Sequence, residues 1–224
     1  MPKIDRVTLE LPSHRTVNAD QAKPTHTPAG SVILIHEWWG LNDEMRALAA
    51  HFSKQGFVAL AIDLFQGEST DDPARARELM TGIDPGLANE TVVAWAQWLR
   101  SQSYCNGHVG AVGYCLGGGW ALNTSIATPI EAAVIYYGNV RKSADELASL
   151  NGPVLGHFGR QDQSIPLDVV EKFSATLKQA GKSGEIHLYD AGHAFSRAGG
   201  PNFDAPSASL AEQRTLDFLH AHLD

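Results

Sequence analysis

Two patterns of apolar residues alternate along the chain. Short apolar runs rich in β-branched residues are typical of strands buried on both faces of a sheet. They stand at 31–35, 57–62, 108–112, 132–137, 154–159 and 185–189. Between most of them, apolar residues recur every three or four positions, which predicts helices with one buried face. These helical segments are 42–55, 73–80, 88–100, 167–179 and 207–223.

This alternation predicts an α/β fold, in which a parallel sheet is covered by helices on both faces. The opening of the chain differs from the rest. Residues 7–11 alternate as an edge strand does, whereas residues 12–30 are polar and contain prolines, so we expect a loop there. No repeat, low-complexity tract or linker interrupts the pattern. With 43% hydrophobic residues, residues 1–224 are predicted to form a single domain.

The stretch from Gly113 to Gly117, with the sequence GYCLG, lies where a predicted strand ends and a helix can begin. This is the context of a nucleophile elbow, a sharp turn with the reactive residue at its tip. Glycines two positions before and after Cys115 would avoid collisions in the strained turn. Cys115 would lie at a helix N-terminus, where free N–H groups favour its thiolate. Taken alone, the motif is also compatible with a buried structural cysteine.

Active sites of parallel sheets lie beyond the carboxyl ends of the strands, so polar residues just after each strand are candidates. They are Glu37, Cys115, Asp162 and His193. The order nucleophile, acid, histidine is the one that the α/β-hydrolase fold uses. We therefore predict that fold, with Cys115, Asp162 and His193 as a catalytic triad. Asp162 would orient His193, which would act as general base and then as general acid.

Charge and composition argue against several classes of partner. A net charge of −8 argues against nucleic acid and anionic membrane surfaces, which favour a basic face. No apolar run approaches the ~20 residues of a membrane span. The two cysteines, Cys105 and Cys115, form no evident disulfide framework, and the chain starts without an apolar signal core, so we expect a cytoplasmic protein. His220 and His222 point to different helix faces and make a poor metal pair. We expect no metal, no cofactor and a monomer.

At four places the chain resembles the dienelactone hydrolases, the cysteine-dependent branch of the α/β hydrolases. The matching stretches are HEWWG at 36–40, GYCLGG at 113–118, GHFG at 156–159 with Asp162, and GHAF at 192–195 with Arg197. The resemblance runs from about Val32 to the C-terminus, and residues before 31 depart most from it.

The resemblance implies roles for several residues. It supports the same triad and links Glu37 to the resting thiol and to its activation when substrate arrives. The N–H groups of Leu116 and Trp38 would form the oxyanion hole. The family also holds a substrate carboxylate with arginines, and Arg197 matches one of them. Arg77, or failing that Arg75, would be the other, although both could equally be solvated helix residues.

The activity implied is hydrolysis of a lactone ester bond of the dienelactone (carboxymethylenebutenolide) type, in the degradation of aromatic compounds. A small, carboxylated ester or lactone would be attacked by the Cys115 thiolate, and water guided by His193 would hydrolyse the acyl-enzyme. Two alternatives stay open. One is a broader carboxylesterase or thioesterase on the same scaffold. The other is a non-hydrolytic, redox-sensing thiol protein with Cys105 as the resolving thiol, although Cys105 is expected at the opposite end of the strand.

Overall fold

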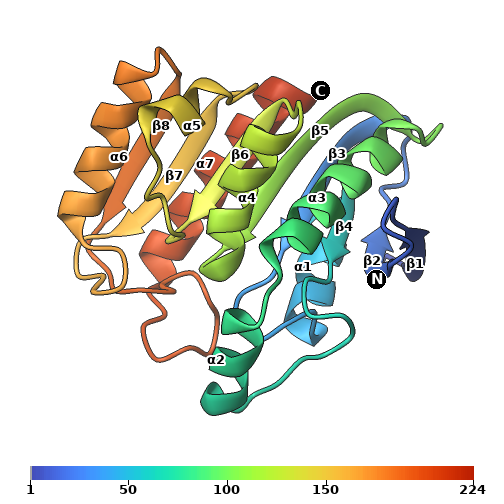
Figure 1. The fold of residues 1–224 in the computed structure, drawn as a ribbon, viewed down its shortest axis with the longest axis horizontal. Coiled ribbons are helices and arrows are strands. Elements are labelled where there is room, and N and C mark those ends of the chain that lie inside the picture. Colours follow the sequence, from blue (N-terminus) through green and yellow to red (C-terminus); the bar gives the residue numbers. More distant parts are fainter. Residues whose placement is uncertain (1) are drawn as a thin grey trace.

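The computed structural model describes residues 2–224, which form one eight-stranded sheet with helices on both faces (Figure 1). The short apolar runs of the sequence are the strands of its parallel part. In chain order the strands are β1 (Ile4–Glu10), β2 (Thr16–Ala22), β3 (Ala29–Ile35), β4 (Val58–Ile62), β5 (Cys105–Tyr114), β6 (Ala132–Tyr136), β7 (Val154–Gly159) and β8 (Gly184–Tyr189).

The sheet is mostly parallel, as the alternation of strands and helices predicts. The strand order is β1-β2-β4-β3-β5-β6-β7-β8, and every neighbouring pair from β4 to β8 is parallel. All residues of β4, β6 and β7 are buried because helices cover both faces. The predicted α/β fold is confirmed.

The N-terminal part corrects one prediction. Residues 12–30 were expected to be a loop, but they contain β2, which is antiparallel to β1 and to β4. Two of its polar residues, Asp20 and Gln21, are buried with partners from other elements. Asp20 accepts hydrogen bonds from Arg6 and, at 2.7 Å, from Nε of Arg46. Gln21 bonds the hydroxyl of Tyr104 at 3.1 Å. A polar segment can form a buried strand when such partners satisfy it.

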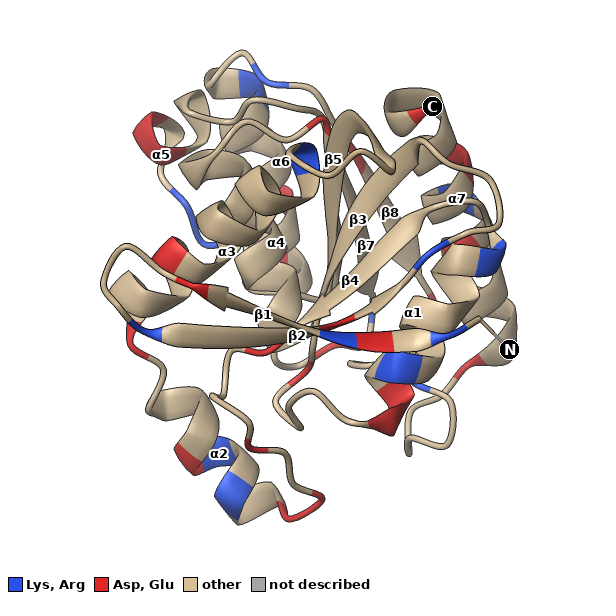
Figure 2. Ribbon diagram, turned by 90° about the vertical axis from the view of Figure 1, so that its right-hand side faces the viewer, with Lys and Arg blue, Asp and Glu red and all other residues tan. Residues whose placement is uncertain are grey.

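The helices divide between the two faces of the sheet. They are α1 (Asp43–Lys54), α2 (Pro73–Thr81), α3 (Pro85–Arg100), α4 (Leu116–Ala127), α5 (Ala144–Ala148), α6 (Leu167–Gln179) and α7 (Ala205–Leu223). On one face, α3, α4 and α6 bury side chains such as Trp95 and Phe173. On the other, α1 and α7 bury Phe52 and Leu219. Figure 2 shows this layering, with α3 and α4 on one side of the sheet and α1 and α7 on the other.

The signals at the ends of α1 act as the sequence predicts. The Asn42 side chain accepts a hydrogen bond from the N–H of Met45 at 3.2 Å and so caps the helix. Asp43 and Glu44 occupy its first turn, where the helix dipole favours acids. The chain leaves the helix through Gly56, whose φ of +97° is unfavourable for other residues.

The helix α2 lies apart from the rest. Ala76 is its only buried residue, and Figure 2 shows α2 beyond the sheet, with acidic and basic residues on it. It belongs to the segment between β4 and α3, which reaches past the carboxyl ends of the strands (Figure 1). Across residues 2–224, no helix has both the length and the apolar character needed to cross a membrane.

Candidate active site

Cys115 stands at the tip of a sharp turn between β5 and α4. Its backbone angles are φ 52° and ψ −112°, a conformation that a non-glycine residue adopts only when its surroundings hold it there. The Cys115 N–H donates to the carbonyl of Tyr136 at 3.0 Å. The side chain is partly exposed, whereas Cys105 is buried at the opposite end of β5.

The glycines around the turn are required by close backbone contacts. A Cβ on Gly113 would lie 1.9 Å from the carbonyl oxygen of Gly117, and a Cβ on Gly117 would lie 2.1 Å from that of Ile35. Gly118 also packs closely, with a Cβ there 2.8 Å from Cα of Gly138. These contacts confirm the steric reason for the glycines of the motif, which let α4 start directly against the ends of β3 and β6.

Cys115, His193 and Asp162 are joined by hydrogen bonds, and we call them the triad. Nε2 of His193 lies 3.2 Å from Sγ of Cys115, and its Nδ1 lies 2.7 Å from Oδ2 of Asp162. The residues come from the ends of β5, β8 and β7, where the strand-end rule places candidate residues. This is the geometry of a nucleophile, a base and a group that orients the base.

The surroundings of His193 favour its protonated form. Burial alone would lower its pKa, but the hydrogen bonds to Asp162 and Cys115 outweigh burial and raise the pKa to about 10. An imidazolium can donate from both ring nitrogens, one to the carboxylate and one to the sulfur. The geometry is therefore that of an imidazolium that faces both a carboxylate and the sulfur.

Further hydrogen bonds hold Asp162 and His193 in place. Oδ1 of the buried Asp162 accepts from the N–H groups of Ser164 and Ile165 at 2.8 and 3.0 Å, which leaves Oδ2 for His193. The loop that carries His193 is fixed by Asn202, whose Nδ2 donates to the His193 carbonyl at 2.9 Å. The Asp162 carboxylate and the loop that carries His193 are thus held in place.

Two backbone N–H groups are the predicted donors to an oxyanion, those of Leu116 and Trp38. Leu116 is the first residue of α4, and Trp38 lies in the turn after β3. Within residues 2–224, neither N–H donates a hydrogen bond to a protein acceptor. The turn is held by the N–H of Thr70, which donates to the Trp39 carbonyl at 3.0 Å. An oxyanion hole made by Leu116 and Trp38 remains a prediction that this arrangement supports.

Glu37 lies at the end of a hydrogen-bond chain and not on the sulfur. The Tyr137 hydroxyl donates to Oε1 of Glu37 at 3.2 Å and lies 2.7 Å from the Ser196 hydroxyl, which must then be the donor to Tyr137. Burial raises the pKa of Glu37, while Arg197 and Tyr137 act to lower it. The Tyr137 ring also packs edge-on against His193, with centroids 5.2 Å apart. Tyr137 therefore connects Glu37 to the triad.

His36 fixes the backbone that carries Glu37. Its ring is fully buried, with Nδ1 2.6 Å from the Glu37 carbonyl and Nε2 accepting from the Leu64 N–H at 3.1 Å. These partners require the proton on Nδ1. Burial lowers the pKa of His36, so it stays neutral and joins the ends of β3 and β4.

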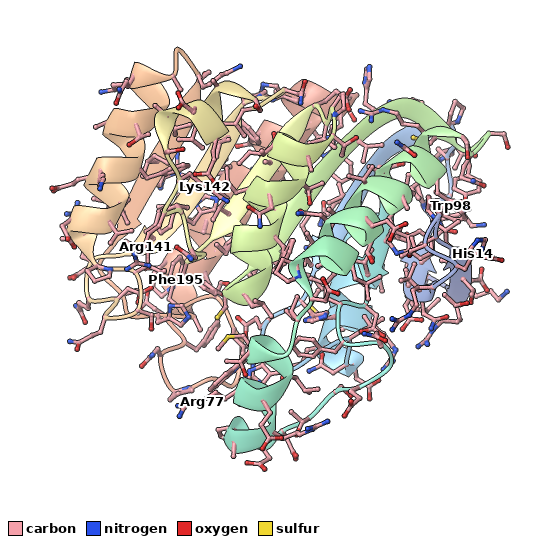
Figure 3. The ribbon with its side chains drawn as sticks, in the orientation of Figure 1. His14, Arg77, Trp98, Arg141, Lys142 and Phe195 are labelled. Carbon is pink, nitrogen blue, oxygen red and sulfur yellow. The ribbon has the colours of Figure 1, made fainter. Side chains whose placement is uncertain are left out.

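The arginines expected to hold a substrate carboxylate form what we call the arginine rim: Arg75, Arg77 and Arg197. Arg197 is already bound by Glu44, with Nε 3.0 Å from Oε2 and Nη2 3.1 Å from Oε1. Arg75 bonds Glu68 and Glu78 at 2.6 and 2.8 Å. No partner within residues 2–224 is found for the exposed side chain of Arg77. Figure 3 shows Arg77 on α2, and Phe195 near the carboxyl ends of the strands.

Two cavities adjoin the site without containing the sulfur. One, of about 490 Å³, lies between the segment after β4 and α3 and is lined by Asp63, Phe65 and Arg75. The other, of about 420 Å³, lies between α1 and α7, and Glu37 and Arg197 form part of its wall. Neither is lined by Cys115 or His193. Cys115 and His193 are nonetheless partly exposed, whereas Asp162 is buried.

Sequence reasoning missed Tyr137, Glu44 and Asn202. Tyr137 directly follows β6, but the apolar run that predicted this strand, 132–137, included it, so the rule that selects polar residues after strands passed over it. No comparable signal marks Glu44, which looks like an ordinary acid in the first turn of a helix, or Asn202, which lies in an irregular loop. In the described part of the chain, no cluster of three or more His, Cys, Asp or Glu side chains could hold a metal ion.

Comparisons with known proteins agree with this geometry. The model of the dienelactone hydrolase family matches residues 17–223. The carboxymethylenebutenolidase of Pseudomonas putida is 30% identical over 228 aligned positions, covering 95% of this chain and 94% of its own. Among solved structures, a Klebsiella pneumoniae protein assigned as a dienelactone hydrolase aligns with a TM-score of 0.87 at 26% identity, over 98% of this chain and 100% of that one.

A further solved structure shows the same fold at lower identity. It is a dienelactone hydrolase-like, promiscuous phosphotriesterase from metagenomic libraries, with a TM-score of 0.87 and 19% identity over 99% of each chain. The fold is thus shared by proteins described by different activities.

Proposed function

Since the chain belongs to the dienelactone hydrolase family and is a hydrolase that acts on ester bonds, we propose that it opens lactones through a cysteine acyl-enzyme. The family points to a small ester or lactone as substrate. The nucleophile would be Cys115, His193 the acid and base, and Asp162 the group that orients His193.

The contact between His193 and Cys115 carries this proposal. Nε2 lies 3.2 Å from Sγ, and the pKa of His193 is raised to about 10 by Asp162 and Cys115 despite burial. A proton on this nitrogen stabilises the thiolate before attack and is available to the leaving oxygen afterwards. The sulfur is also partly exposed, as a nucleophile must be.

The proposed reaction has two steps. The Cys115 sulfur forms a bond to the lactone carbonyl carbon, and the resulting oxyanion is held by the N–H groups of Leu116 and Trp38. The carbon–oxygen bond of the ring then breaks, the leaving oxygen takes the proton of His193, and a thioester remains. Neutral His193 next removes a proton from water, which attacks the thioester and releases the acid and the thiolate.

The proposed substrate is a lactone with a good leaving group, such as an enol lactone. A thiolate leaves more easily than an ordinary alkoxide, so a poor leaving group would return the adduct to the starting ester. Arg197, from the arginine rim, is the proposed partner for a substrate carboxylate, because its planar fork can bind both oxygens. Degradation of aromatic compounds is the proposed setting, as the resemblance to the family implies.

The experiment that tests the proposal is mass spectrometry of the protein quenched during turnover of an activated ester. We expect an acyl group on the peptide that contains Cys115, and none on the same peptide of the Cys115→Ala variant. Iodoacetamide should modify Cys115 stoichiometrically and abolish hydrolysis. Full activity in the Cys115→Ala variant would refute the proposal.

A broader carboxylesterase is the second candidate, and one observation favours it. Arg197 is occupied by Glu44, so the site is complete without a substrate carboxylate. Turnover of p-nitrophenyl acetate at a rate close to that of a carboxylated lactone would support this reading, and strong preference for the lactone would exclude it. The redox-sensor alternative loses its resolving thiol, because Cys105 and Cys115 lie at opposite ends of β5.

We also infer that one chain forms the whole catalytic unit. The triad and both free N–H groups come from the same chain, so a monomer suffices for the proposed chemistry. A reactive thiol with no disulfide partner suits a reducing compartment such as the cytoplasm. Sedimentation at the concentrations used for kinetics tests the monomer.

A further inference from the structure

The ion pair between Glu44 and Arg197 joins parts of the chain that are far apart in sequence. Glu44 lies in the first turn of α1 and Arg197 in the loop after β8. Two parallel contacts connect them, Nε to Oε2 at 3.0 Å and Nη2 to Oε1 at 3.1 Å. This is the bidentate geometry in which a guanidinium also binds the carboxylate of a ligand. Glu44 therefore fills the fork of Arg197.

Arg197 faces the reacting groups through a short series of contacts. Its guanidinium carbon lies 4.9 Å from the centre of the Trp39 ring, and its Nε is 3.8 Å from Oε2 of Glu37. Glu37 in turn accepts from Tyr137, which packs against His193. A carboxylate bound by Arg197 would thus take the place of Glu44 and would be linked to His193 through Glu37 and Tyr137.

We propose that Glu44 is a specificity-determining residue: its carboxylate competes with a substrate carboxylate for Arg197 and biases the enzyme towards uncharged esters. This inference rests on the proposed function, because it concerns the substrate of the same site. With Glu44 bound, and with Glu37 close by, the charge of Arg197 is neutralised towards an approaching anion. An anionic substrate has to displace Glu44, whereas a neutral ester does not.

Displacing Glu44 from Arg197 costs little free energy. The Glu44 side chain is 56% exposed and that of Arg197 is 27% exposed, so their ion pair is screened by water. A displaced Glu44 keeps a favourable place, since the first turn of a helix stabilises an acid in any case. Competition of this strength changes the affinity for an anionic substrate by about two- to fivefold.

The test compares two esters that share a leaving group and a four-carbon acyl chain: p-nitrophenyl butyrate and the p-nitrophenyl monoester of succinic acid. The quantity measured is the ratio of kcat/KM for the succinate ester to that for the butyrate ester. We expect Glu44→Gln to raise this ratio about two- to fivefold, mainly through a lower KM for the succinate ester. Removing Arg197 as well, in the Glu44→Gln, Arg197→Gln double variant, should cancel the gain.

Asp43→Asn is the matched control. It removes the same charge from the same turn of α1, but Asp43 bonds Arg46 at 2.7 Å and not Arg197. We expect its ratio to equal that of the wild type, and thermal unfolding of all variants should show intact folding. Glu44→Ala serves as a second variant, because it removes the amide that Gln could still offer to Arg197.

The outcomes separate this inference from the proposed function. An unchanged or lower ratio in both Glu44→Gln and Glu44→Ala, with hydrolysis intact, overturns the role of Glu44. An equal rise in Asp43→Asn overturns it too, since the effect would then be one of overall charge. A failure of the proposed function gives a different result. Both esters would then be hydrolysed independently of Cys115, and this inference would be wrong as well.

Discussion

The triad and the arginine rim lie at the same edge of the sheet but are held in opposite ways. In the triad, backbone N–H groups and buried contacts fix each partner and leave a reactive atom free, as Ser164 and Ile165 do for Asp162. In the arginine rim, the charged end of each paired arginine is taken by acids of the chain itself, as Glu44 takes Arg197. The part of the site proposed to break the ester bond is thus fully assembled, while the part that would select an anion is occupied.

This difference shows what each part demands of the protein. Catalysis at a sulfur needs positions fixed to a fraction of an ångström, and strand ends and tight turns supply such positions. Recognition of a carboxylate needs only a reachable charge, so exposed side chains on a helix or loop suffice and can exchange partners. We therefore expect substitutions in the triad to abolish hydrolysis and substitutions in the rim to change substrate preference.

The largest effect is expected from Cys115→Ala. Loss of the nucleophile should lower kcat for p-nitrophenyl acetate by at least about 10,000-fold, because positioning and the oxyanion hole alone leave only a small residual rate. The measurement is a steady-state assay together with thermal unfolding. The Cys105→Ala variant, which lacks the other thiol, should keep its activity. A comparable loss of activity in Cys105→Ala would contradict the assignment of the chemistry to Cys115.

Gly117→Ala tests whether the backbone turn is as rigid as the triad requires. The new Cβ would lie 2.1 Å from the Ile35 carbonyl oxygen, so we expect a loss of about 3 kcal/mol in the free energy of unfolding, with activity reduced in the folded fraction. Chemical denaturation measures this. Gly119→Ala is the matched control, as its Cβ would approach no closer than 3.3 Å to another residue. Equal stability of the two variants would contradict a tight turn.

Arg197→Gln should act on the rim alone. We expect kcat/KM for a carboxylated lactone to fall about tenfold, because a hydrogen bond between two charged groups is lost, and the rate on a neutral ester to fall far less. Arg77→Gln, on the exposed face of α2, should change the preference by less than about twofold. A uniform loss on both substrates in Arg197→Gln would place Arg197 among the groups that shape the triad.

The smallest expected effect is the absence of a titration. The raised pKa of His193, about 10, means that its imidazolium persists below that pH and is lost only above it. We therefore expect the NMR signals of the His193 ring to stay unchanged between about pH 5 and pH 9, whereas an ordinary histidine, with a pKa of about 6.5, titrates within that range. Asp162→Asn, which removes the carboxylate that accepts from Nδ1, should bring the titration of His193 towards that range. A titration of the wild-type ring near pH 6.5 would refute the raised pKa.

Much of the fold follows from local patterns. The parallel strands are continuous apolar runs, and the helices carry apolar stripes with caps such as Asn42. β2 could not be found this way, because its buried Asp20 and Gln21 resemble a loop until Arg46 and Tyr104 are brought to them by folding. The short helix α5 was not predicted either, although Ser143 and Glu146 form a capping box at its start.

The candidate site likewise has a part that the sequence predicts and a part that arises only on folding. Cys115, Asp162 and His193 could be selected because each follows a strand, and parallel strands end at one edge. The occupation of Arg197 by Glu44 could not, because these side chains meet only through the packing of α1 against the loop after β8. The spacing of residues in the sequence predicts where the backbone lies better than it predicts which partner a long, flexible side chain contacts.

The placement of the two cysteines has a practical consequence. β5 runs from a buried Cys105 to the turn that exposes Cys115, so the ends of this strand are about 30 Å apart. A thiol reagent that does not unfold the chain meets a single sulfur. Titration of Cys115 with such a reagent can therefore measure the concentration of folded protein. The same thiol can carry one fluorophore or spin probe, with no engineered cysteine and no signal from labelled Cys105.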